Sequence, residues 1–174
     1  LGTGKTQLIK ALIYQMVAHP ENNRGHKPRF LIFDYKDDYS SEDFVEATGA
    51  KVVDPFKLPL NIFDVTNCTA RKPWMERYKF FSDVLSKIYG GIGQVQQLNI
   101  KNAVRQAYQK ASEQGMPAPL LEQVLSEYID VTNGRADSPM NILSDLVDME
   151  IFETNTDKIV PFEEFMDGVV VINL

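Results

Sequence analysis

The chain begins with Leu1-Gly2-Thr3-Gly4-Lys5-Thr6, and this stretch decides the fold that we expect. Gly4, Lys5 and Thr6 match the last three fixed positions of the pattern G-x-x-x-x-G-K-[ST], whose backbone cradles nucleotide phosphates. The first glycine of that pattern would lie two residues before Leu1, so we expect the chain to be part of a longer protein. The alternative interpretation is a glycine-rich turn that only precedes an amphipathic helix.

The residue types at this corner suit an anion. Glycine has no Cβ, so the backbone N–H groups of Gly2, Thr3 and Gly4 can approach a phosphate closely. A helix that begins near Lys5 points its positive end at the same anion. We expect Lys5 to reach the β- and γ-phosphates and the Thr6 hydroxyl to ligate Mg²⁺.

Helix and strand patterns alternate after this corner. Residues 7–18 read as a helix with apolar side chains on one face, namely Leu8, Ile9, Leu12, Ile13 and Met16. Residues 29–33 are a continuous apolar run, which is typical of a strand buried on both faces. A short helix over 42–48, ended by Gly49, and a short strand over 51–53 follow. This alternation predicts an α/β fold with a parallel sheet.

The pattern then changes, because residues 71–152 show only helical periodicity. Helices are expected near 74–89, 94–114 and 119–133, and from an N-cap at Ser138 to Phe152. Residues 155–167 are polar, and 168–174 return to a buried strand pattern. We therefore expect residues 1–66 and 156–174 to belong to one α/β core, interrupted by an all-helical insertion over 67–155.

The composition limits the class of protein. The 174 residues are 44% hydrophobic and 24% charged, as in an ordinary soluble domain. No apolar run approaches the roughly 20 residues that span a bilayer, and a single cysteine, Cys68, fits a cytoplasmic location. The net charge is −6 and the pI is about 4.9, which argues against a broad DNA-binding surface. Any contact with DNA is expected at a local patch or in other parts of the protein.

Two polar residues end the predicted core strands. Asp34 follows the apolar run at the place where the ligand crevice of an open parallel sheet forms. It could bind an Mg²⁺-coordinated water or order the phosphate loop, or it could only end the strand and cap a turn. Asn173 ends a strand that resembles the one delivering the Mg²⁺-binding Asp in phosphate-loop ATPases, but an amide is a poor substitute for that carboxylate. We interpret that last strand as structural and expect the principal acidic ligand and general base beyond Leu174.

Several segments together resemble the HerA/FtsK clade of hexameric P-loop ATPases. The resemblance rests on the order and spacing of residues 1–7 (LGTGKTQ), 30–39 (FLIFDYKDDY), 60–63 (LNIF), 94–108, 119–125 and 168–174. It spans essentially the whole chain, and the most similar subgroup is the HerA-like ATPase DptH of phosphorothioation-dependent DNA restriction systems. The sequence departs from the family pattern at Asp37, where a glycine is usual, and at Asn173, where an Asp is common.

The resemblance implies a RecA-like P-loop NTPase core that binds ATP and Mg²⁺ and moves double-stranded DNA as a homo-oligomeric, hexameric ring. The implied nucleotide contacts are Gly2, Thr3, Gly4, Lys5, Thr6, Gln7 and Asp34, with Lys5 catalytic and Thr6 on the metal. The implied partners are DNA and other restriction or processing subunits, without a membrane. We expect the 174 residues alone to lack turnover, because the carboxylate that orients water is not visible among them.

Two alternatives stay open, one within enzymes and one from another class. One is a phosphoryl-transfer enzyme such as a small-molecule kinase, although the helical segment carries no arginine cluster of the kind found in a substrate lid. The other is an ATPase-like scaffold that binds partners without hydrolysis, which Asn173 and the acidic pI favour mildly.

Overall fold

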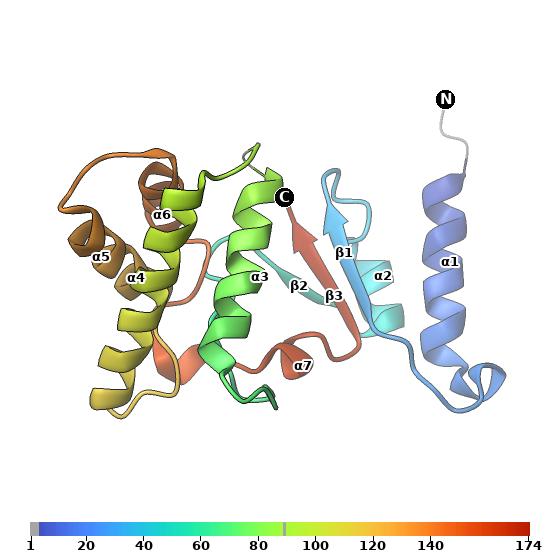
Figure 1. The fold of residues 1–174 in the computed structure, drawn as a ribbon. Helices are drawn as coiled ribbons and strands as arrows, with labels where there is room; N and C mark the ends of the chain where they lie inside the picture. The colour runs from blue at the N-terminus through green and yellow to red at the C-terminus, as the bar shows by residue number, and fades with distance from the viewer. Residues whose placement is uncertain (1–3, 89) are drawn as a thin grey trace. The chain divides into compact units, whose positions relative to one another are not determined.

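The computed structural model describes residues 4–88 and 90–174, which form an α/β unit and a helical unit (Figure 1). The α/β unit comprises Leu1–Leu58 and Phe162–Leu174, and the helical unit comprises Pro59–Pro161. From the sequence we expected the helical segment over 67–155. The helical unit therefore also includes the extended stretch around Asn61 and the polar segment up to Pro161.

The α/β unit contains the elements that the sequence predicts. In chain order they are α1 (Lys5–Ala18), β1 (Phe30–Asp34), α2 (Glu42–Thr48), β2 (Lys51–Val53) and β3 (Val169–Asn173). Two short elements were not predicted, the 3₁₀ turn Pro20–Asn23 and the single helical turn α7 (Phe162–Phe165). Gly49 ends α2 in the left-handed conformation, with φ 65°, as expected of a glycine after a helix.

The strands form a parallel sheet in the order β1-β3-β2. The last strand of the chain is therefore the central one. Phe30 pairs with Val169 and Asp34 with Asn173, while Lys51 pairs with Val170 on the other side. Val169, Val170 and Val171 are at most 1% exposed, and β3 has a paired strand on each side. The prediction of an α/β fold with a parallel sheet is confirmed.

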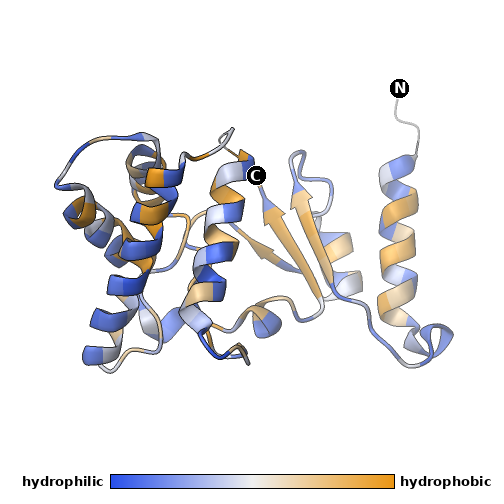
Figure 2. Ribbon diagram, viewed as in Figure 1, coloured by the Kyte–Doolittle hydropathy of each residue, from blue (hydrophilic) through white to orange (hydrophobic). Residues whose placement is uncertain are grey.

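The prediction that β1 is buried on both faces is wrong. Phe30 and Ile32 join the core with Ile13 of α1 and Phe44 of α2, but Leu31 and Phe33 are 36% and 56% exposed. Successive side chains of a strand point to opposite faces, and β1 is an edge strand with β3 as its paired neighbour. Figure 2 shows why the sequence misleads, since β1 is as hydrophobic along its length as the central strand β3.

Helix α1 also differs from the simplest expectation. Of its predicted apolar face only Ile13 is buried, whereas Leu8, Ile9, Leu12 and Met16 are exposed. Ile13 and Val17 pack against the core of the α/β unit, and they lie one turn apart on the side of the helix next to these exposed residues. We call Leu8, Ile9, Leu12 and Met16 the α1 stripe. The hydrophobic colour along α1 in Figure 2 therefore includes surface as well as core.

The helical unit contains α3 (Pro73–Ile88), α4 (Gln94–Glu113), α5 (Leu121–Thr132), α6 (Ser138–Asp148) and the 3₁₀ turn Thr156–Lys158. Its core includes side chains with no exposed surface, namely Phe63, Ile100, Val104, Val124, Tyr128 and Leu143. The Asn61 side chain donates to the carbonyl of Pro119 and accepts from the N–H of Phe63. The extended stretch before α3 is thereby tied to the start of α5.

The last predicted helix begins and ends at other residues than expected. Its N-cap is Asp137, whose carboxylate accepts from the N–H of Met140 at 3.1 Å, and Ser138 is already helical. The same carboxylate accepts from the hydroxyl of the buried Tyr128 at 2.8 Å, so the cap is supported by the core. The helix ends at Asp148 rather than Phe152. In the part of the chain that the structure describes, no helix is both long and apolar enough for a bilayer.

Candidate functional site

The first turn of α1 begins at the predicted phosphate-binding residues. Gly4 is the N-cap with φ 68°, a left-handed conformation that glycine adopts without strain, and its carbonyl accepts from the N–H of Leu8 at 2.9 Å. Lys5 and Gln7 are exposed and Thr6 is half-buried. The first N–H groups of a helix have no partner within it, so this turn offers donors to an anion. Gly2 and Thr3 lie outside the described residues.

The carboxyl ends of the parallel strands lie at the same end of the α/β unit as this turn (Figure 1). Asp34 ends β1 and Asn173 ends β3, and the two residues are register partners. The N–H of Leu174 continues the ladder by donating to the carbonyl of Asp34 at 2.8 Å. An open parallel sheet binds ligands at this edge, which we call the carboxyl edge.

The Asp34 carboxylate is buried and organises the loop that follows β1. Oδ1 accepts from the N–H groups of Lys36 and Asp38, both at 3.2 Å. Oδ2 accepts from the N–H of Tyr39 at 2.7 Å and from the Ser40 hydroxyl at 3.3 Å. Burial acts to raise the pKa of the Asp34 carboxyl, but the N–H donors and the hydroxyl outweigh burial and hold this pKa below its ordinary value.

These contacts are those of a residue that ends a strand and caps a turn, which was one of the two interpretations from the sequence. The direct role of Asp34 toward a nucleotide or a metal-bound water stays a prediction. Both of its oxygens accept hydrogen bonds from the loop, and these bonds hold the backbone of residues 36–40 at the carboxyl edge.

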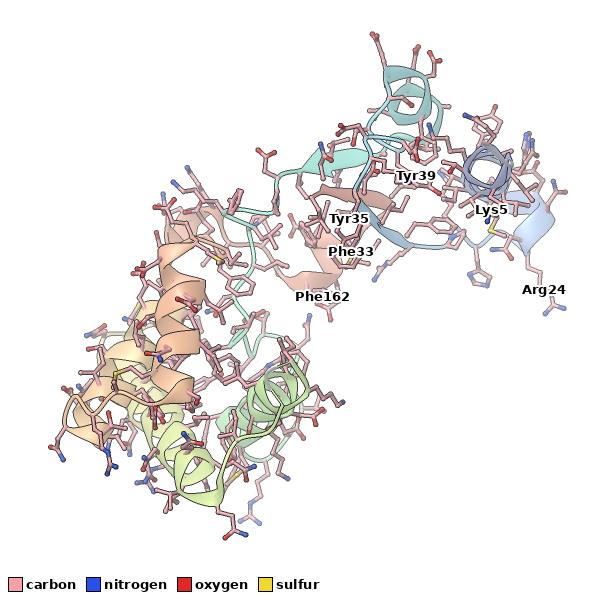
Figure 3. All side chains as sticks on the ribbon, turned by 90° about the horizontal axis from the view of Figure 1, so that it is seen from above. Lys5, Arg24, Phe33, Tyr35, Tyr39 and Phe162 are labelled. Atoms are coloured by element: carbon pink, nitrogen blue, oxygen red, sulfur yellow. The ribbon has the colours of Figure 1, made fainter. Side chains whose placement is uncertain are left out.

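The loop after β1 is attached to α1. Lys10 Nζ donates to the Ser41 hydroxyl at 3.1 Å and lies 5.8 Å from the centre of the Tyr39 ring. The Tyr39 ring meets Phe44 of α2 edge to face, with ring centres 5.5 Å apart. Figure 3 looks onto the carboxyl edge and shows Tyr39 on the side of Lys5, with Tyr35 farther from α1. The loop that Asp34 organises therefore packs against the helix whose first turn carries Lys5 and Thr6.

Asp37 lies in this loop, and sequence reasoning missed its partner. It adopts φ 56°, in the left-handed region that favours glycine, and its Oδ1 accepts from Nδ2 of Asn173 at 2.8 Å. The two departures from the family pattern are thus in contact. A signal was present in the sequence, because a non-glycine residue at a glycine position and an amide at an acidic position are both unusual. That the two residues contact each other follows only from the pairing register of β1 and β3, which the sequence alone does not give.

The other residues singled out at the ends of β1 and β3 are spread over the edge. Tyr35 is 75% exposed, and no hydrogen bond or ion pair of Lys36's side chain is found within residues 4–88 and 90–174. Over the same residues, no group of three or more His, Cys, Asp or Glu side chains is arranged to hold a metal ion. The Thr6 hydroxyl and the carboxylates of the loop after β1 are among the oxygen donors that the described residues offer at this edge.

The chain is similar in structure to VirB4 of Thermoanaerobacter pseudethanolicus. The TM-score is 0.65, the sequence identity is 11%, and the match covers 97% of this chain and 65% of that chain. The chain therefore shares the fold of the matched part of VirB4, and it spans about two thirds of the length of that protein. At this identity the likeness shows the fold alone. No protein-family model matches the sequence, and no curated protein matches it significantly.

Proposed function

We propose that the chain is the nucleotide-binding core of an ATPase of the FtsK/HerA type and binds ATP through the first turn of α1. The observation that carries the proposal is the coincidence of Gly4, Lys5 and Thr6 with a helix start at the carboxyl edge of a parallel sheet. The VirB4-like fold supports this class. A glycine-rich turn without a ligand role would not require the Lys-Thr pair at this position.

The residues have distinct roles in this proposal. Gly4 and the N–H groups of the first turn surround the phosphates, and Lys5 neutralises charge on the β- and γ-phosphates. The Thr6 hydroxyl is the protein ligand for Mg²⁺, and the sparse ligand set fits this ion, because nucleotide-bound Mg²⁺ takes most of its ligands from phosphates and water. When bound, the ion supplies neutralisation of the charge that develops on the transferred phosphoryl group.

The further steps of the proposal concern partners. We propose that hydrolysis drives movement along double-stranded DNA within a ring of identical subunits, with other restriction or processing subunits as partners. The net charge of −6 confines DNA contact to a local surface or to partners. The narrower resemblance to the ATPase of phosphorothioation-dependent restriction stays a prediction from sequence order alone.

Calorimetric titration with ATP and Mg²⁺ tests the proposal. Wild-type protein is expected to bind, and Lys5→Ala is expected to weaken binding at least tenfold, because a charge-assisted contact to phosphate is worth about 1.5–3 kcal/mol. Lys27→Ala is the matched control, since Lys27 is an exposed lysine in the loop before β1. Absence of binding by the wild-type protein would refute the proposal.

An ATPase assay with and without duplex DNA separates the remaining alternatives. The motor hypothesis expects DNA-stimulated turnover by the complete protein and none by residues 1–174 alone. Binding without turnover in the complete protein would favour the scaffold, and transfer of phosphate to a small molecule would favour the kinase.

A further inference from the structure

Positive charge is concentrated in the first turns of α3 and in the segment just before this helix. Residues 71–79 hold four of the chain's 18 basic residues and a single acid, Glu76, although the net charge of the chain is −6. The four basic residues are Arg71, Lys72, Arg77 and Lys79. Within residues 4–88 and 90–174 none of them forms an ion pair, and the buried Nε of Arg77 has no hydrogen-bond partner. The described part of the chain therefore leaves this positive charge unneutralised.

Three of these cations surround one hollow. Arg71, Lys72 and Lys79 line a hollow of about 420 Å³ on the helical unit, and all three are exposed. Lys72 directly precedes α3, and Lys79 follows it by about two helical turns, so the two lie on the same side of the helix. The acid that lines the same hollow, Glu76, accepts from the Cys68 thiol at 3.4 Å. Three cations and one acid leave the hollow with an excess of positive charge.

Like charges gathered around one hollow favour an anion at that place. Their mutual repulsion is relieved when a negative group lies among them. The row from Lys72 to Lys79 is roughly 10 Å long, at about 1.5 Å per helical residue. Duplex DNA carries one negative charge per about 1.7 Å of its axis, so a row of this length faces several phosphates. A single free phosphate reaches only part of the row, and an extended polyanion therefore fits the arrangement better.

We propose that Arg71, Lys72 and Lys79, which we call the basic surface, bind the phosphate backbone of double-stranded DNA. The inference rests on the proposed function for the choice of duplex DNA as the polyanion. It goes beyond that function because it assigns the contact to the helical unit, whereas Lys5 and Thr6 belong to the α/β unit. Contacts of this kind position a duplex without reading its sequence. They also make DNA binding compatible with an acidic chain, since only a local surface is needed.

Fluorescence anisotropy of a labelled duplex of mixed sequence tests the inference. The complete protein is titrated into the duplex without nucleotide at several salt concentrations. We compare the wild-type protein with a triple variant that carries Arg71→Gln, Lys72→Gln and Lys79→Gln. Each phosphate contact contributes about 0.9 to the slope of log affinity against log salt concentration. The triple variant should therefore lower the magnitude of this slope by about 2–3 and weaken binding at low salt at least about tenfold.

A control variant changes the charge of the protein by the same amount at other places. It carries Lys27→Gln, Arg135→Gln and Lys158→Gln, and these three residues are exposed and lie outside the basic surface. We expect the slope of the control variant to stay within about 1 of the wild-type slope. An equal reduction in the two triple variants would show that overall charge governs binding, and would overturn the inference. Because all six side chains are exposed, both variants should keep the wild-type melting temperature.

Chemical footprinting gives a second readout that needs no substitution. Exposed lysines of the wild-type protein are acetylated with and without saturating duplex, and the modified peptides are measured by mass spectrometry. Lys72 and Lys79 should react several-fold more slowly when DNA is bound, whereas Lys27 and Lys158 should react at unchanged rates. Unprotected Lys72 and Lys79 in the DNA complex would refute the assignment of the contact to the basic surface.

Competition separates DNA from an acidic protein segment. Poly-glutamate at the same concentration of negative charge should displace little of the labelled duplex, because its charge is less densely spaced than that of DNA. Displacement as effective as that by unlabelled duplex would overturn the choice of DNA and favour an acidic peptide.

The results that overturn this inference differ from those that overturn the proposed function. DNA binding by the wild-type protein with an unchanged slope in the basic-surface variant refutes the inference alone. Absence of DNA binding by the wild-type protein refutes both the inference and the motor hypothesis, while ATP binding at the first turn of α1 is judged by its own titration. Lys5→Ala should leave DNA affinity without nucleotide unchanged, since Lys5 lies outside the basic surface.

Discussion

Replacing Asp34 by asparagine should release the loop after β1 from the end of the strand. Asparagine has nearly the same size as aspartate and keeps one oxygen. Its NH₂ group, however, would face the Tyr39 N–H and the Ser40 hydroxyl, which in the wild-type protein donate to Oδ2 of Asp34. The side chain is 3% exposed, so little water can enter to replace the lost acceptor. The N–H of Tyr39, whose bond at 2.7 Å is the shortest of the four, would face either a donor or no partner.

The magnitude follows from the number of bonds lost. The retained oxygen of asparagine can still serve Lys36 and Asp38, and the Ser40 hydroxyl can rotate to accept from the new NH₂ group. That leaves one charge-assisted N–H bond lost outright and the others weakened. At roughly 1.5–3 kcal/mol for a hydrogen bond to a charged group, we expect a loss of about 2–4 kcal/mol in the free energy of unfolding.

Urea denaturation followed by far-UV circular dichroism measures this loss, and amide hydrogen exchange at residues 36, 38 and 39 locates it. The direction in which the free energy of unfolding changes with pH is determined by the pKa of Asp34, which lies below its ordinary value of 3.8 in the folded protein. Its stabilisation is present above that value and is lost as the pH falls through the lower folded pKa. Asp34→Asn should therefore remove part of the wild-type loss of stability in acid.

Asp54→Asn is the matched control, because Asp54 follows β2 just as Asp34 follows β1 but is exposed. It should change stability by less than about 0.5 kcal/mol. A loss below about 0.5 kcal/mol for Asp34→Asn, or an equal acid dependence in both variants, would show that the Asp34 contacts do not hold the loop.

Three further outcomes are expected. Tyr128→Phe should lower the free energy of unfolding by about 1–2 kcal/mol at neutral pH, because the hydrogen bond to Asp137 is lost. Burial and the bond to Asp137 raise the pKa of Tyr128 above its ordinary value of 10.0. The wild-type protein should therefore lose stability above that pH and the variant should lose less, which melting curves at alkaline pH would measure. Asp137→Ala should lower the free energy of unfolding by about 1–2 kcal/mol, and Ser138→Ala should lower it by under about 0.5 kcal/mol. Urea titrations measure both losses, and a larger loss for Ser138→Ala would contradict Asp137 as the N-cap. Gly49→Ala should cost about 1–2 kcal/mol because φ is 65°, and an unchanged melting temperature would exclude strain at that position.

Sequence reasoning found the elements that periodicity and punctuation define. The helix starting at Lys5, the helix ended by Gly49 and the returning strand before Leu174 were predicted from local signals, and the structure confirms them. Local signals could not reveal which strand is central, because order in a sheet depends on contacts between distant segments. The apolar run 29–33 was therefore wrongly expected to be buried on both faces, although it forms an edge strand.

In the candidate site, too, local sequence signals predicted some residues and missed contacts between distant segments. The motif alone predicts Lys5 and Thr6, and the structure places them in the first turn of α1 at the carboxyl edge. The bond between Asp37 and Asn173 joins positions that are distant in sequence, and neither residue has a local pattern that names the other. The correct N-cap of α6 was missed for a related reason. Both Asp137 and Ser138 are good capping residues, and the buried hydroxyl of Tyr128 gives Asp137 an additional bond that the sequence does not display.

The position of β3 has a consequence for biosynthesis. Within residues 4–88 and 90–174, β1 and β2 each pair only with β3, so neither meets this partner until Val169–Asn173 leaves the ribosome, after the entire helical unit Pro59–Pro161. The helical unit can acquire its core first, whereas the nascent α/β unit waits without β3 and with apolar side chains such as Ile32 in water. Chaperone dependence and aggregation during expression should therefore originate in residues 30–53 rather than in the helices.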